Sequence, residues 1–149
     1  MIRIGLLITL VALAIACSFS CYGWNHTEPG AQIVMQYGLS GEPGRHGSRM
    51  AAFFTLPALL LGLAFLLSLA PMIDPRGKNI RRSRPVFLVG WVIVAVAIAV
   101  SQGFITWTAV GGEPDAAVMA RGVTAFVGLI MLVLGLVLGK ARPNFFVGF

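Results

Sequence analysis

The side chains in this sequence that could do chemistry are few: two cysteines, two histidines and five carboxylates among 149 residues. Cys17 and Cys21 lie one helical turn apart, and His26 follows them. Thiolates and imidazole bind zinc, but a structural zinc site takes four ligands, and we find His26 as the one further candidate near the two cysteines. We therefore interpret the two cysteines as small packing residues and expect no metal and no other cofactor.

The carboxylates form no catalytic pattern either. Glu28, Glu42, Asp74, Glu113 and Asp115 are scattered over the segments between apolar runs. The sequence contains no HExxH zinc-protease motif, no phosphate-binding glycine-rich loop and no GxSxG nucleophile motif. We expect that the protein is not an enzyme.

Cys17 has a second interpretation, as the lipidated cysteine of a bacterial lipoprotein. Arg3 precedes an apolar stretch that ends in Ala14-Ile15-Ala16-Cys17, so residues 1–16 could form a cleaved signal. However, Ala14 stands where lipoprotein signals usually carry leucine, and apolar residues continue through Trp24. The sequence therefore favours an uncleaved first membrane span.

The composition indicates the elements that carry these residues. Hydrophobic residues make up 58% of the sequence and charged residues only 11%, and the mean hydropathy is +0.89. Such values exclude a disordered chain, a disulfide-rich secreted scaffold and an ordinary soluble enzyme. The net charge of +6 is explained by basic residues sorted to one membrane face, so we expect no nucleic-acid partner.

Four uncharged runs, at residues 4–27, 50–73, 85–112 and 122–139, are each long enough to cross a bilayer as a helix. Residues 92–100 read VIVAVAIAV, without the alternation of a barrel strand. The sequence therefore predicts an all-α, polytopic membrane protein, a single membrane domain over residues 1–149. We expect four transmembrane helices at about 4–21, 51–70, 86–108 and 122–139, with the lipid bilayer as their main partner.

Basic residues predict the orientation of the four spans. With the N-terminus inside, eight basic residues fall on the inner side and three on the outer side, which fits the positive-inside rule. We expect a multi-pass protein of the bacterial cytoplasmic membrane with both termini cytoplasmic. The inner loop 71–85 carries most of this charge and either sets the topology or also binds anionic lipid or a regulator protein.

The two loops around the second helix have predicted structure. In the outer loop 22–50, apolar residues alternate from Ile33 to Leu39, which indicates a short strand in a partly ordered cap. Pro43-Gly44 predicts a type II turn, and Asp74-Pro75-Arg76-Gly77 in the inner loop predicts a type I turn.

The helix interiors contain a few informative residues. Trp91 and Trp107 lie near the two ends of the third run, as interfacial aromatic belts would. Gln102 lies inside it and is expected to bond to a neighbouring helix or to the backbone. Three glycines of the fourth run share one face and would let another backbone approach closely: Gly128, Gly135 and Gly139.

Three segments between the apolar runs have distinctive residue orders. They read QYGLSGEPGRHGSR at residues 36–49, PMIDPRGKN at 71–79 and GKARPNFFVG at 139–148. In this order they resemble the SdpI family of bacterial toxin-immunity membrane proteins, including the poorly characterised domain in their N-terminal half, from about residue 31 onward. Gln36 stands where that family usually has histidine and Gly44 where it has aspartate, so no role of that histidine is carried over.

The resemblance implies immunity against a membrane-active peptide toxin outside, with signalling to a regulator protein through the basic inner loop. The family motifs and the basic loop together make the following residues candidates for these roles: Gln36, Gly41, Pro43, Ser48, Arg49, Pro71, Asp74, Pro75, Arg76, Asn79, Arg81, Arg82, Pro143 and Asn144.

Family members usually continue past the third segment into two more membrane helices, so we expect a fragment or a shortened member. Two other functions stay open: a small transporter or channel subunit, and a structural subunit whose fourth helix docks another protein. The sequence does not indicate an oligomeric state.

Overall fold

The computed structural model describes residues 1–38, 42–73 and 83–139, and it confirms the all-α membrane fold. Its helices are α1 (Ile2–His26), α2 (Arg49–Ile73), α4 (Arg84–Ala109) and α5 (Ala116–Leu138). All four are long and apolar enough to cross a membrane. Two short strands, β1 (Gln32–Val34) and β2 (His46–Ser48), lie between α1 and α2.

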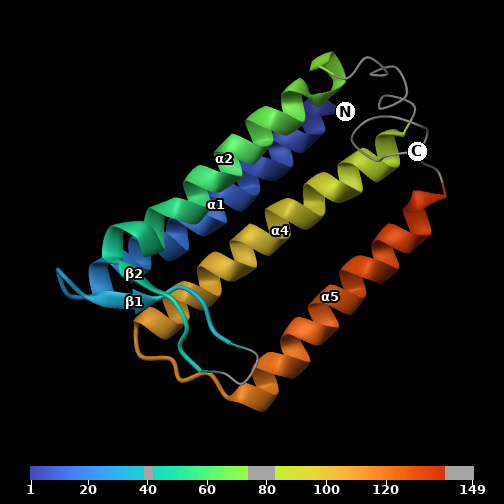
Figure 1. Cartoon of the computed structure of the whole chain (residues 1–149). Coiled ribbons are helices and arrows are strands. Elements are labelled where there is room, and N and C mark those ends of the chain that lie inside the picture. The colour runs from blue at the N-terminus through green and yellow to red at the C-terminus, as the bar shows by residue number, and fades with distance from the viewer. Residues whose placement is uncertain (39–41, 74–82, 140–149) are drawn as a thin grey trace.

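Three of the helices form a bundle, and α5 lies beyond α4 (Figure 1). The helix α1 packs against both α2 and α4, whereas α5 contacts only α4 among the elements that the structure describes. The start of α1, the end of α2 and the start of α4 share one end of the bundle, here named the N-terminal end. The strands and the α4–α5 connection lie at the other end, the hairpin end.

The close packing of α1 against α2 and α4 follows from a stripe of small residues that recurs every three or four positions. All six are buried: Gly5, Thr9, Ala12, Ala16, Ser20 and Gly23. A Cβ atom at Gly5 would lie 2.5 Å from the ring of Trp91 on α4, and one at Gly23 would overlap the ring of Phe53 on α2. Small residues allow this close approach, which maximises dispersion contacts between membrane helices.

Side-chain hydrogen bonds join the three bundled helices. The indole Nε1 of Trp91 donates to Thr9 Oγ1 at 2.8 Å, and Gln102 Nε2 donates to the Ala52 carbonyl at 3.3 Å. Thr106 Oγ1 donates to the Phe19 carbonyl at 3.2 Å. The expectation for Gln102 is confirmed. Such bonds matter in lipid because no water is present to satisfy a polar group.

The interfacial interpretation of Trp91 is wrong. This residue is 1% exposed, and its ring fills the space above Gly5. Its indole N–H donates to Thr9 rather than to the lipid headgroups. The N–H of a buried tryptophan usually has a hydrogen-bond partner. Trp107 is 48% exposed near the hairpin end, as an interfacial residue would be.

All four helices extend beyond the predicted bounds at one or both ends, and α1 and α5 do so most. The helix α1 continues past Cys21 to His26, where Asn25, His26 and Thr27 side chains bond to carbonyls four residues earlier. The helix α5 begins at Ala116, because Asp115 caps it by accepting a hydrogen bond from the Val118 backbone N–H at 2.9 Å. Arg121 therefore lies inside α5 rather than before it.

Candidate functional site

Among the described residues, a β-hairpin at the hairpin end carries an exposed polar surface. Its strands are antiparallel, with Ile33 opposite Gly47 and Val34 opposite His46. Backbone hydrogen bonds continue beyond the strands, from Met35 N–H to the Arg45 carbonyl at 2.8 Å and from Gly44 N–H to the Gln36 carbonyl at 2.9 Å. The predicted strand is thus confirmed, although it is short.

The segment at Pro43 and Gly44 differs from the predicted turn. A type II turn with Pro43 and Gly44 in its centre needs a positive φ at Gly44. The positive-φ glycines of the described residues are Gly30 and Gly111, so this expectation is wrong. Pro43 instead lies opposite Tyr37 in an isolated antiparallel bridge, and the pairing continues past the point where the turn was expected.

An apolar contact and an aromatic contact fix the hairpin on the bundle. Ile33 is 4% exposed and packs against Ala52, Phe53 and Ile105. Tyr37 meets the ring of Phe104 edge-on at 5.5 Å between centroids. Because these partners come from both α2 and α4, the hairpin is held over the bundle as a fixed cap.

The Ser48-Arg49 pair of the family motif begins α2 and ties it to α1. Ser48 Oγ accepts a hydrogen bond from the Ala51 N–H at 3.2 Å, as an N-cap residue does. The guanidinium of Arg49 lies 3.9 Å from the centroid of the Trp24 ring, and Nη2 donates to the Trp24 carbonyl. This contact joins residues 25 positions apart. No local pattern in the sequence indicates it.

The exposed face of the cap is polar and of mixed charge. Its exposed residues include the candidates Gln36 and Pro43 and also three that sequence reasoning did not select: Glu42, Arg45 and His46. Gly41 lies outside the described residues. Gln36, Pro43 and Ser48 are thus exposed, whereas Arg49 is half-buried and holds the start of α2 against Trp24 of α1.

The remaining candidates do not join this surface. Pro71 is buried in the last turn of α2, and α5 carries the three glycines singled out for helix packing, with open space around each. Eight candidates lie outside the described residues: Asp74, Pro75, Arg76, Asn79, Arg81, Arg82, Pro143 and Asn144.

The cysteines do not pack inside the bundle. Cys17 and Cys21 are both free and exposed, because they lie on the face of α1 turned away from the small-residue stripe. The packing interpretation is therefore wrong for contacts within this chain. In the described part of the chain, no three side chains of the metal-ligating types gather into a group that could hold a metal ion.

The small-residue stripe of α1 was not predicted, although the sequence contains the pattern that indicates it. Its spacing of three and four positions is visible in the printed sequence. The aligned face of small residues is the pattern that predicts close helix packing.

No protein-family model, no curated protein and no solved structure matches the chain.

Proposed function

We propose that this protein protects a bacterial membrane against a membrane-active peptide toxin, with the capping hairpin as the surface that binds the toxin. The three motif segments that resemble the SdpI family support the class of function. The observation that carries the choice of surface is the fixed hairpin, whose backbone is paired and whose inner side packs on α2 and α4.

A fixed hairpin suits recognition because little conformational entropy is lost when a partner binds. The mixed charges of Glu42, Arg45 and His46 suit a peptide that carries polar groups beside its apolar face. The predicted orientation places this surface outside the cell, where a toxin arrives. Reporter fusions at Gly112 and Lys78 should read opposite sides of the membrane.

The main experiment is a survival assay in a toxin-sensitive bacterium that expresses the chain. Cells are challenged with a peptide toxin of the kind that SdpI-family immunity proteins neutralise, and with an unrelated pore-forming peptide. We expect protection against the first toxin only. The double variant Arg45→Gln with His46→Gln should lose this protection at normal membrane abundance.

The matched control is Arg121→Gln, which removes an exposed cation near the same end of the molecule but outside the hairpin. This variant should protect like the unchanged protein. Full protection by the hairpin double variant would contradict the assignment of the surface. No protection by the unchanged protein, at normal abundance, would contradict the function itself.

Signalling through the basic inner loop is the second half of this proposal. Arg81→Gln with Arg82→Gln should abolish the output of a reporter for toxin-dependent signalling. The amount of the protein in the membrane should stay unchanged. Six inner and three outer basic residues remain, which still favours the same topology. If the output of the signalling reporter stays unchanged, the basic residues of the loop only set the membrane topology.

A structural subunit is the second candidate function, and one observation favours it. The helix α5 has no buried residue, although it is as long and apolar as a membrane-spanning helix. Such a helix offers a complete face to another membrane protein. Co-purification of a partner that is lost on changing α5, but retained on changing the hairpin, would favour this candidate.

A further inference from the structure

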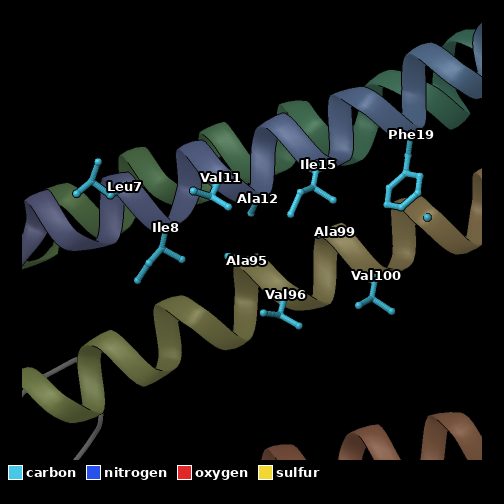
Figure 2. A pocket seen from close by; sticks show the side chains of 11 residues that line it. Leu7, Ile8, Val11, Ala12, Ile15, Phe19, Ala95, Val96, Ala99 and Val100 are labelled. Atoms are coloured by element: carbon cyan, nitrogen blue, oxygen red, sulfur yellow. The ribbon is translucent and has the colours of Figure 1, made fainter.

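An elongated groove with a volume of about 640 Å³ runs along the line where α1 and α4 meet (Figure 2). Its floor consists of small residues from both helices: Ala12, Ala95, Ala99 and Gly103. Its wall on α1 consists of larger residues spaced four apart: Leu7, Val11, Ile15 and Phe19. Small residues beneath large ones produce the depth of the groove.

The length of the groove suits an extended hydrocarbon chain. The stretch of α1 from Leu7 to Phe19 is ~18 Å long at the rise of an α-helix. One acyl chain spans about half of the ~30 Å hydrocarbon core of a bilayer, so an extended acyl chain can lie along most of this length.

The lining has the chemistry of a lipid site. Every residue that lines the groove is apolar, and both helices are long enough to span a bilayer. No side chain in the lining offers a hydrogen bond to a polar group of a peptide. Only the hydrocarbon part of an amphiphile makes favourable dispersion contacts with this lining.

The two ends of the groove differ. At the hairpin end, the Phe19 ring lies over Gly103, so close that a Cβ atom there would be 3.1 Å from the ring. At the other end, Arg3 is exposed one helical turn before Leu7, in the same row of residues spaced four apart. The groove is thus closed by an aromatic ring at one end and has a cation at the other.

We propose that this groove holds one acyl chain of an anionic phospholipid, whose headgroup phosphate pairs with Arg3. Arginine near the end of a membrane helix reaches the headgroup level, where it pairs with phosphate. The acyl chain enters at the Arg3 end and runs toward Phe19. This site lies in the membrane span, away from the hairpin, and does not depend on the proposed immunity function.

The test is to count lipids retained by the full chain. The protein is reconstituted in nanodiscs of equal phosphatidylglycerol and phosphatidylcholine, extracted in mild detergent and weighed by native mass spectrometry. We expect one retained phospholipid per chain, mainly phosphatidylglycerol. Ala99→Phe, which fills the floor of the groove, should abolish retention of both lipids.

The matched control is Ala125→Phe, which adds the same ring at an exposed position on α5, outside the groove. This variant should retain lipid normally. Arg3→Gln changes an exposed residue and so should leave the fold intact. It should lower the preference for phosphatidylglycerol about fivefold, while one lipid stays bound.

Three outcomes would overturn the proposal. The first is retention of lipid by Ala99→Phe at the level of the Ala125→Phe control. The second is an unchanged headgroup preference in Arg3→Gln, which would refute the phosphate contact. The third is a lipid-free chain that runs as a dimer, since a second copy would then cover the groove.

Discussion

The helices α1 and α5 are similar in length and apolar character, yet they differ completely in packing. Six residues of α1 are buried against α2 and α4, whereas none of α5 is buried. Both helices carry small residues at regular spacing, and α5 even has the better-known glycine pattern in Gly135 and Gly139. The comparison teaches that small residues drive close packing only where a partner supplies large side chains that fit over them.

The physical reason is the absence of a hydrophobic driving force between helices in lipid. Helices there associate through dispersion contacts, so each small residue needs a neighbour that fills the space it leaves. On α1 that neighbour is Trp91 over Gly5 and Phe53 over Gly23. On α5, a Cβ atom at Gly128, Gly135 or Gly139 would meet nothing within 4 Å.

The largest effect should follow from enlarging the α1 stripe. In Gly5→Leu, the new side chain overlaps the Trp91 ring, whose atoms lie 2.5 Å from the position of its Cβ. Overpacking of this kind costs about 3 kcal/mol or more, because the ring is itself buried and has nowhere to move. The loss in the free energy of unfolding is measured in mixed micelles of a mild detergent and sodium dodecyl sulfate. Circular dichroism monitors the transition.

The matched control is Gly135→Leu, the same substitution on α5. It meets open space and replaces a poor helix former by a good one, so the stability of the single chain should not fall. Equal destabilisation by the two variants would break the comparison, because α5 would then be packed as closely as α1.

The four helices were predictable from the sequence, since a long uncharged run has few alternatives in a membrane protein. Their bounds were less so. The end of α1 depends on Asn25, His26 and Thr27 bonding back to carbonyls, and the start of α5 depends on Asp115. A hydropathy profile does not detect polar side chains that form hydrogen bonds at helix ends.

The next effect concerns the attachment of the hairpin. Arg49→Gln removes the cation over the Trp24 ring and the charged hydrogen bond to the Trp24 carbonyl. We expect a loss of about 1–2 kcal/mol where the start of α2 packs on α1, which also loosens the hairpin that leads into α2. Hydrogen exchange at the amides of Met35 and Gly44, which bond across the hairpin, should become faster.

Arg45→Gln is the control for this experiment, because it removes an exposed arginine of the same hairpin. Exchange at both amides should stay slow in that variant. Unchanged exchange in Arg49→Gln would mean that Ile33 and Tyr37 hold the cap without the arginine.

The candidate site was less predictable than the helices. The alternation around Ile33 indicated a strand, and the family motif drew attention to Ser48 and Arg49. Neither pattern distinguished exposed residues from those that attach the hairpin. That distinction comes from the contacts of Arg49 with Trp24 and of Tyr37 with Phe104, which form only in the folded chain.

A smaller effect is expected from the hydrogen bond between α1 and α4. Trp91→Phe keeps an aromatic ring over Gly5 but removes the donor to Thr9. Interhelical hydrogen bonds in membrane proteins contribute about 0.6 kcal/mol, so we expect a loss near this value beyond the change in ring size. A double-mutant cycle with Thr9→Val isolates the bond, and a coupling energy near zero would mean that it contributes nothing to stability.

The smallest effect on the single chain should come from Gly135→Leu with Gly139→Leu, because both positions face open space. This double variant tests whether α5 associates with a helix of another chain. If another membrane helix packs on this face of α5, the two leucines hold the backbones apart and weaken association by roughly 1 kcal/mol, a partial loss rather than a collapse. Energy transfer between labelled chains, or with a co-purified partner, measures this in membranes. Unchanged association together with unchanged unfolding would show that the glycines of α5 reflect composition alone, in contrast to the small residues of α1.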